Sequence, residues 1–305
     1  MTDLSTSVGD LRLPNPVMTA SGTAGHGSEL GRYVPLDSLG ALVVKSLSIM
    51  PWDGNPPPRV IDLPGAMMNS VGLQGPGVAG WIDDELPALR SSGARVVASI
   101  WGRTVEEYAQ AAEALAAVQD DLFAVELNVS CPNLEDRRRM FAHSGDSAAA
   151  VVAATDVLAV PRWAKLSPNV ADIAEIAGAV HSAGIDAVTL TNTLLGLVLD
   201  PETGRPVLGG GGGGVSGPAM RPVALRAVFD VAAAHPELPV IGVGGIAAPE
   251  HVVQYLRAGA SAVQVGTATF ANPRSTASII TGLDRWCTDH GVERVADLIG
   301  SAHTI

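Results

Sequence analysis

Eight short runs of β-branched and other apolar residues alternate with helical patterns along the chain, and this alternation constrains the fold more than any other feature. The runs lie at residues 16–20, 42–45, 95–100, 123–128, 163–166, 187–192, 240–243 and 262–265. Between them, Ala-rich stretches with helical apolar spacing occupy residues 105–118, 147–158, 170–183 and 219–234. Alternating strands and helices are typical of parallel sheets. Eight such units predict an α/β fold, a closed (β/α)8 TIM barrel, with a doubly wound open sheet as the alternative.

The length of 305 residues suits one such barrel, so we expect a single domain spanning residues 1–305. Apolar residues make up 47% of the chain and charged residues 16%, which is the composition of a globular protein. Two connections, 46–93 and 193–217, are long. Long insertions in barrels usually lie at the C-terminal face, as lids or partner surfaces. The second contains six consecutive glycines, residues 209–214, which we expect to be flexible and to order on binding.

The formal net charge is -12 at pH 7. A chain this acidic lacks the basic face that nucleic acid or an anionic membrane requires, so we expect neither as a partner. Residues 1–10 have no basic or apolar region typical of a signal peptide, and no uninterrupted apolar run reaches the roughly 18 residues of a membrane span. We therefore expect a cytoplasmic protein whose two cysteines, Cys131 and Cys287, are free thiols.

Lysine is rare in this chain, and both lysines end predicted strands. Of the 19 Lys and Arg residues, only Lys45 and Lys165 are lysines. A lysine retained in an arginine-rich sequence indicates a site that needs a compact point charge. Asn128, Asn192 and Ser99 also lie at strand ends. Each one alone could cap the following helix, but in a barrel all strand ends meet at one mouth, so together they predict a polar pocket.

Glycines follow the last two predicted strands. Gly244 and Gly245 follow one strand, and Gly266 and Thr267 follow the other. Glycines at these positions let backbone N–H groups approach an anion near a short helix N-terminus. The pattern predicts a phosphorylated ligand or cofactor but indicates no particular reaction.

Cys131 begins the loop that leaves the fourth predicted strand, three residues after Asn128. A lone cysteine is more often a small buried hydrophobic residue than a catalyst. The position of Cys131 at the barrel mouth favours a catalytic role instead. Cys287 lies in an apolar pattern near the C-terminus, and we expect it to be a packing residue.

Nine segments match one enzyme family, in order and over nearly the whole chain. They read NPVMTASGT, GNPPPR, MNSVGLQGPG, ELNVSCPN, KLSPNV, TNTLLG, SGPA, GVGGI and AGASAVQVGTATF. These motifs resemble those of the class 1 dihydroorotate dehydrogenases, and NSVGLQGPG and NVSCPNLE are most similar to subclass 1B. In that subclass the catalytic subunit works with an iron–sulfur flavoprotein. The resemblance therefore implies such an electron-transfer partner, and we expect a homodimeric core.

The resemblance implies flavin mononucleotide (FMN) as cofactor and oxidation of dihydroorotate to orotate in de novo pyrimidine biosynthesis. The positions implied in flavin binding are Ala20, Ser21, Lys45, Ser46, Ser99, Asn128, Lys165, Thr191, Gly217, Gly244, Gly245, Gly266 and Thr267. The positions implied in substrate binding are Lys45, Asn69, Ser70, Val71, Gly72, Leu73, Asn128, Asn192 and Thr193. Cys131 is implied as the catalytic base, which removes a proton from ring carbon C5 while hydride leaves C6 for flavin N5. No metal site is implied.

The sequence departs from the family pattern in three places. Ser99 stands where the family usually has Asn, and Trp101 adds bulk beside it. Residues 134–143, LEDRRRMFAH, replace the glycine-containing lid that covers the substrate in relatives. The six-glycine run is also unusual. These departures concern the substrate more than the fold or the cofactor.

Two other functions remain open from the residues. One is a diverged FMN-binding paralogue that acts on another dihydropyrimidine-like ring. The other is a flavin-free lyase or aldolase that uses a strand-end lysine as a Schiff base on a phosphosugar. The lyase accounts for the barrel and the phosphate loops, but not for Cys131 near Asn128 or for two lysines with separate tasks.

Overall fold

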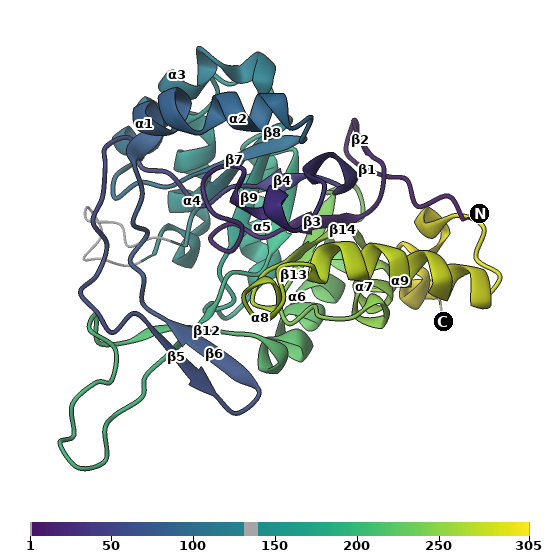
Figure 1. The fold of residues 1–305 in the computed structure, drawn as a ribbon. Helices are drawn as coiled ribbons and strands as arrows, with labels where there is room; N and C mark the ends of the chain where they lie inside the picture. Colours follow the sequence, from purple (N-terminus) through teal and green to yellow (C-terminus); the bar gives the residue numbers. More distant parts are fainter. Residues whose placement is uncertain (1, 131–139, 305) are drawn as a thin grey trace.

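The computed structural model describes residues 2–130 and 140–304, and an eight-stranded parallel sheet forms its centre (Figure 1). The sheet order is β3-β14-β13-β10-β9-β8-β7-β4, so each strand lies beside its neighbour in the sequence. The strands are β3 (Val17–Thr19), β4 (Leu42–Val43), β7 (Val96–Ile100), β8 (Ala124–Asn128), β9 (Arg162–Leu166), β10 (Ala187–Leu190), β13 (Val240–Val243) and β14 (Ala260–Val265). Each coincides with one predicted run to within two residues at either end. This order confirms the predicted (β/α)8 barrel and excludes the doubly wound open sheet.

The barrel closes between β3 and β4, partly through a side chain. Thr19 Oγ1 accepts a hydrogen bond of 2.8 Å from Val43 N and donates one of 3.1 Å to Val43 O. Backbone bonds from Gly40 N to Val17 O, at 2.8 Å, and from Thr19 N to Ala41 O, at 3.3 Å, continue the seam. A buried threonine therefore takes the place of regular strand pairing where β4 has only two residues.

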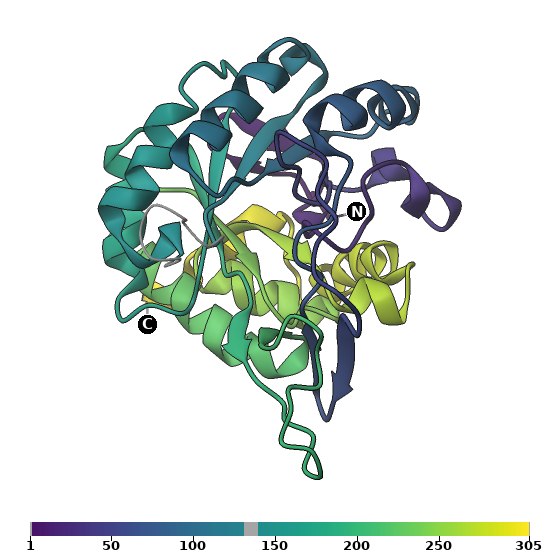
Figure 2. The same cartoon turned by 90° about the vertical axis from the view of Figure 1, so that its left-hand side faces the viewer.

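Helices surround the barrel on its outer side (Figure 2). They are α1 (Gly77–Asp84), α2 (Leu86–Ser91), α3 (Val105–Ala116), α4 (Gly145–Ala154), α5 (Ile173–Ser182), α6 (Arg221–Ala234), α7 (Pro249–Arg257), α8 (Ala268–Ala271) and α9 (Ser275–Asp289). The short 3-10 helices are η1 (Glu29–Arg32), η2 (Leu36–Ser38), η3 (Gln119–Asp121), η4 (Phe141–His143), η5 (Pro218–Met220), η6 (Val295–Leu298) and η7 (Ser301–Thr304). All four predicted helical stretches overlap a helix, namely α3 to α6. No helix in the described part of the chain is long and apolar enough to cross a membrane.

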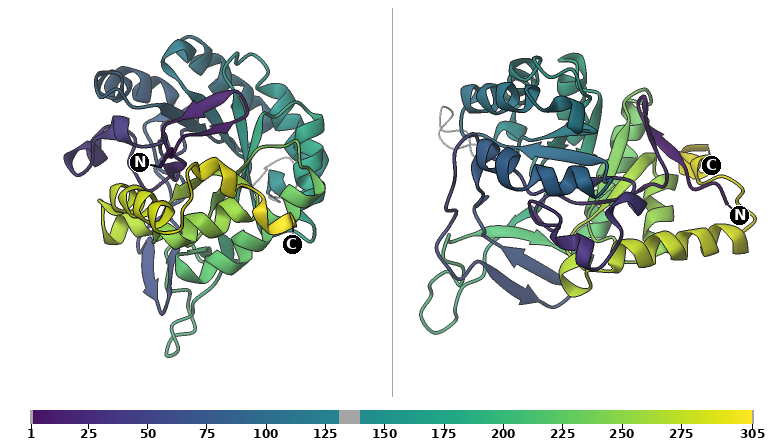
Figure 3. Two further views of the ribbon diagram at one scale, coloured as in Figure 1. Left: turned by 90° about the vertical axis from the view of Figure 1, so that its right-hand side faces the viewer. Right: turned by 45° about the horizontal axis from the view of Figure 1, so that its top comes forward.

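One end of the barrel is closed by apolar side chains. Met18, Val97 and Trp163 belong to a fully buried cluster inside the barrel, which Val8 and Leu13 also join. These last two come from the N-terminal hairpin of β1 (Thr6–Val8) and β2 (Leu11–Leu13), which lies across this end (Figure 3). The opposite, C-terminal end of the barrel is therefore the one that can accept a ligand.

The two long connections pair with each other at the C-terminal end. Their strands are β5 (Val60–Leu63), β6 (Ala66–Asn69), β11 (Leu194–Gly196) and β12 (Gly213–Ser216), and they form an antiparallel sheet of order β11-β12-β6-β5. The predicted location of the insertions is confirmed. The sheet itself was not predicted from the sequence.

The prediction of a flexible segment at residues 209–214 is wrong for Gly213 and Gly214, which belong to β12. Their lack of a side chain serves close packing. A Cβ atom on Gly213 would lie 2.4 Å from the Asn69 carbonyl oxygen, and one on Gly214 would lie 2.1 Å from Thr193 Oγ1. Real Cβ atoms do not approach so closely, so these glycines let β12 lie directly against its neighbours.

Candidate active site

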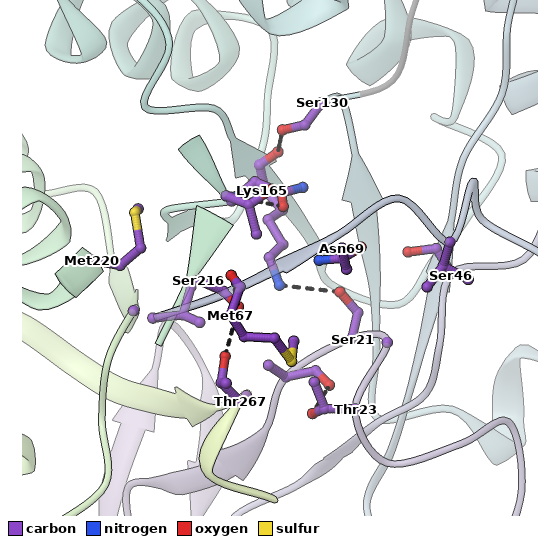
Figure 4. Close-up of a pocket in the computed structure, with 18 of the residues that line it drawn as sticks. Ser21, Thr23, Ser46, Met67, Asn69, Ser130, Lys165, Ser216, Met220 and Thr267 are labelled. Carbon is purple, nitrogen blue, oxygen red and sulfur yellow. Dashed lines mark hydrogen bonds between the residues drawn. The ribbon is translucent and has the colours of Figure 1, made fainter. Parts of the chain in front are cut away.

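A cavity of about 520 Å³ opens at the C-terminal end of the barrel, beneath the inserted sheet (Figure 4). All predicted cofactor and substrate residues except Ser70 and Ser99 line it. These lining residues are Ala20, Ser21, Lys45, Ser46, Asn69, Val71, Gly72, Leu73, Asn128, Lys165, Thr191, Asn192, Thr193, Gly217, Gly244, Gly245, Gly266 and Thr267. The structure thus brings together residues that are far apart in the sequence.

Ser99 and Ser70 lie behind the cavity wall and do not line it. Ser99 is fully buried, and its hydroxyl lies 2.8 Å from the hydroxyl of Ser46, which also accepts a 3.3 Å hydrogen bond from Asn128 Nδ2. A serine at this strand end is too short to pass Ser46, so it supports the wall. Ser70 Oγ accepts a 2.9 Å hydrogen bond from Asn55 Nδ2, which fixes the loop that follows β6.

Trp101, which adds bulk beside Ser99, does not line the cavity. Its side chain is buried and is not among the lining residues. Its ring packs edge-on against Trp52, with ring centroids 5.9 Å apart, and the Arg103 guanidinium lies 4.8 Å from the centroid of Trp52. The extra bulk therefore anchors the first insertion to the end of β7.

The predicted base, Cys131, lies outside the described residues, as do residues 132–139, which include most of the predicted lid. Ser130, the last described residue before them, lines the cavity. Cys287 is a buried free thiol, as predicted, and burial is the main cause that raises its pKa.

Lys165 reaches the cavity from within the barrel. Only 4% of its surface is exposed. Its ammonium donates 3.1 Å hydrogen bonds to Ser21 Oγ and to Gln264 Oε1, and the first is drawn in Figure 4. The Glu126 carboxylate lies 3.7 Å from Nζ. This lysine therefore has a carboxylate partner below the cavity floor.

Lys45 differs because it forms no salt bridge with any described residue. Burial lowers its pKa, and the positive charge of Arg59 lowers it further. Next to it, burial and the charge of Lys45 lower the pKa of His26 to about 4, so this imidazole is neutral at physiological pH. Lys45 is thus a partly desolvated cation whose charge is available to an anion in the cavity.

Amide side chains form another side of the cavity. Asn192 Nδ2 donates a 3.1 Å hydrogen bond to Asn128 Oδ1, while Asn192 Oδ1 accepts one of 2.8 Å from Thr193 N. Asn69 approaches from β6, and its Nδ2 lies 3.4 Å from the Gly214 carbonyl oxygen. Three segments therefore direct amide groups, which both donate and accept hydrogen bonds, toward one space.

The far end of the cavity is formed by glycine-containing loops. A Cβ on Gly245 would lie 2.8 Å from Arg221 Cβ and 2.9 Å from the Gly217 carbonyl oxygen, so only glycine lets these loops meet. Thr267 Oγ1 and Ser216 Oγ lie 2.9 Å apart at the same place. Small residues, hydroxyls and the start of the short helix α8 suit a phosphate group. The residues present therefore fit a phosphorylated cofactor.

Comparison with known proteins agrees with this geometry. The family model for dihydroorotate dehydrogenase matches residues 3–286. The chain belongs to the dihydroorotate dehydrogenase family. It is 45% identical over 299 residues to the protein of Trichlorobacter lovleyi named dihydroorotate dehydrogenase B (NAD(+)), catalytic subunit, with 98% of both chains covered. The protein of the same name from Desulforamulus reducens is 44% identical over 303 residues, with 99% of both chains covered.

Membership of the dihydroorotate dehydrogenase family confirms the resemblance and rules out the flavin-free lyase. The environment of Lys165 agrees, because its ammonium is committed to two hydrogen bonds and a carboxylate and is not presented as a nucleophile. No cluster of His, Cys, Asp or Glu within residues 2–130 and 140–304 could hold a metal ion.

Sequence reasoning missed the apolar wall of the site. This wall consists of Val60, Met67, Met220, Val243 and Phe270. The side chains of Val60 and Phe270 stand at the rim, where they are 51% and 57% exposed. Phe270 lies inside the motif AGASAVQVGTATF, so the sequence offered a signal for it. Val60 and Met67 reach the site only through the pairing of the inserted strands, which no local pattern indicated.

Proposed function

We propose that this protein oxidises dihydroorotate to orotate with bound FMN, as the first step in passing electrons to a separate subunit. The observation that carries the proposal is the placement of the only two lysines of the chain in one cavity with different surroundings. Lys165 has a buried carboxylate partner, whereas Lys45 has none among the described residues. The reaction needs two such cations, one for the flavin and one for the substrate carboxylate.

The residues assigned to FMN are those that reach from the strand ends to the glycine-containing loops. We assign Lys165 and Ser21 to the ring system and the Gly245 and Thr267 loops to the phosphate. Bound FMN supplies the acceptor for hydride. The role of the chain is to hold the ring with a fixed cation beside it, where negative charge grows on reduction.

The residues assigned to the substrate are one lysine and three amide side chains. We assign Lys45 to the substrate carboxylate, because no carboxylate among the described residues forms a salt bridge with it. Asn69, Asn128 and Asn192 can pair with the imide edge of a pyrimidine ring, which both donates and accepts hydrogen bonds. Asn128 is buried and Asn69 and Asn192 are half-buried, so a ring that does not match their donors and acceptors would lose hydrogen bonds in a partly dry site.

Cys131 is proposed as the base that removes the C5 proton. If it is, Cys131→Ala should slow flavin reduction by dihydroorotate about a hundredfold or more while FMN remains bound, because general-base catalysis typically contributes factors of 10²–10⁴. Cys131→Ser should also be slow at neutral pH, with a rate that keeps rising as pH increases, because a hydroxyl is a much weaker acid than a thiol.

Stopped-flow flavin reduction across pH measures these rates. Cys287→Ala is the matched control, since this second thiol is buried in α9, and it should reduce at the wild-type rate. Reduction of Cys131→Ala at the wild-type rate would show that Cys131 is not the base.

An iron–sulfur flavoprotein is the proposed electron acceptor. The named relatives are catalytic subunits of NAD(+)-dependent enzymes, which implies a separate subunit in those proteins. Two cysteines cannot supply the usual four thiolates of an iron–sulfur cluster, so this chain alone should reduce NAD poorly. Rapid NAD reduction by the purified chain would contradict the proposal. A homodimeric core, a single functional domain over residues 1–305 and a cytoplasmic location stay predictions.

A further inference from the structure

A carboxylate lies in the interior of the barrel directly below the proposed flavin site. Glu126 on β8 is fully buried, as are Thr189 on β10 and Gln264 on β14. They form a polar layer with Lys165, between the apolar cluster that closes the barrel and the cavity above. Burying a charge is costly unless it is paired and hydrogen-bonded. The layer therefore calls for an explanation beyond packing.

The hydrogen bonds in this layer form a chain in which Lys165 donates to Gln264 and Gln264 donates to Glu126. Glu126 Oε2 accepts a 2.6 Å bond from Gln264 Nε2 and a 3.1 Å bond from Thr189 Oγ1. Gln264 Oε1 in turn accepts the 3.1 Å bond from Lys165 Nζ. Because the amide NH₂ must face the carboxylate, the amide oxygen must face the ammonium. Glu126 therefore determines which acceptor Lys165 meets.

Glu126 also acts on Lys165 directly. Its Oε1 has no hydrogen-bond partner among the described residues and lies 3.7 Å from Lys165 Nζ. Gln264 and Ser21 accept two of the three protons of the ammonium, which leaves one proton for a ligand in the cavity. The carboxylate holds the charge of Lys165 in place from below without using this last proton.

We propose that Glu126 is the positioning residue of Lys165, and that it fixes the ammonium at the floor of the cavity where charge develops on the reduced flavin. This inference rests on the proposed FMN function. Glu126 lies below the layer that lines the cavity, so it acts through Lys165 and Gln264 and not by contact with the cofactor.

Glu126→Gln tests the inference with little change of volume. No orientation of the new amide suits both neighbours, because its NH₂ group must face either the Lys165 ammonium or the Gln264 NH₂. Lys165 then loses the one carboxylate that pairs with it among the described residues, and it loses its fixed acceptor. Reduced FMN should bind about 10- to 100-fold more weakly relative to oxidised FMN, as expected for loss of a charged hydrogen bond. A tenfold weaker binding of reduced FMN relative to oxidised FMN corresponds to a midpoint potential about 30 mV more negative.

The measurements are the FMN dissociation constant and the midpoint potential of the bound flavin. An exchange variant, Glu126→Gln with Gln264→Glu, places a carboxylate at the position whose oxygen now lies 3.1 Å from Lys165 Nζ. It should move the potential back toward the wild-type value. Glu107→Gln is the control, because that carboxylate lies on the outer helix α3, where it pairs with Arg103, and its loss should leave the potential unchanged.

An unchanged or more positive potential in Glu126→Gln would overturn the inference, since Glu126 would then be only a packing group or a counter-charge. If Glu126→Gln fails to fold, the exchange variant tests the inference instead. An exchange variant that folds but keeps a more negative potential than the wild type would also overturn the inference. Failure of the wild-type protein to bind FMN would instead refute the proposed function, so the two failures are distinguishable.

Discussion

Gly214→Ala tests whether the inserted sheet positions the substrate side of the cavity. Gly214 pairs with Leu195 of β11 and with Asn69 of β6. An added Cβ would lie 2.1 Å from Thr193 Oγ1 and 2.7 Å from Thr193 Cβ. Since atoms in ordinary contact lie about 3.5–4.0 Å apart, Thr193 or β12 must move by roughly 1 Å or more.

Such a shift has separate consequences for stability and for function. Overpacking of a close contact typically costs about 1–3 kcal/mol, so the free energy of unfolding should fall by that amount. A displacement of about 1 Å in a positioning group can cost up to roughly 100-fold in rate, so flavin reduction should slow by about 10- to 100-fold. FMN content should stay unchanged, because Gly214 is not among the residues that line the cavity.

Urea denaturation, stopped-flow reduction and the absorbance of bound FMN measure these three quantities. Orotate titration measures the affinity for the product, which should also fall. Gly212→Ala is the matched control from the same glycine run, because its Cβ would lie 3.1 Å from a single atom, the Gly196 carbonyl oxygen. Adding Thr193→Ala to Gly214→Ala removes the contact with Oγ1 but keeps the one with Cβ, so it should restore stability only in part and should not restore orotate affinity. Wild-type orotate affinity in a Gly214→Ala protein of reduced stability would refute the assignment of Thr193 to the substrate.

Three further predictions concern closure of the barrel and pH. Thr19→Val leaves the Val43 N–H and carbonyl groups without partners, and urea denaturation should show a loss of about 2 kcal/mol or more. Orotate affinity should fall as the pH is raised toward the lowered pKa of Lys45, because the neutral amine cannot attract a carboxylate. Lys45→Met should abolish this pH dependence. The pKa of His26 is about 4 in the folded state against 6.5 ordinarily, so stability should fall as pH drops from 6.5 toward 4. His26→Gln should remove about 1–2 kcal/mol of that loss, a value below the energy equivalent of the full pKa shift because solvent screens this partly exposed ring. Denaturation at several pH values measures the loss.

The barrel strands could be predicted because each is a short apolar run bounded by turns, and even the two-residue β4 lies within such a run. The sheet of β5, β6, β11 and β12 could not. Its pairing joins Asn69 to Gly214, far apart in the sequence, and the contact depends on glycines whose role is visible only in three dimensions. From composition alone a run of glycines is expected to be flexible, whereas here Gly213 and Gly214 are needed because close neighbours leave no room for a side chain.

The candidate site was predictable where residues stand at strand ends, because all strand ends of a barrel meet at one mouth. Lys45, Lys165 and Asn128 follow that rule. Ser99 also ends a strand, but its short side chain stops behind Ser46. The period of two along a strand places Glu126 on the same face as Asn128, so the sequence held a signal for the buried carboxylate.

Anaerobic titration of the FMN-loaded protein with dihydroorotate tests the central claim most directly. The claim predicts that the visible absorbance of the flavin is bleached and that about one orotate forms per flavin, since hydride transfer is stoichiometric. It also predicts that the purified protein is yellow and releases FMN on denaturation. A protein that holds FMN but is not reduced by dihydroorotate would contradict the claim.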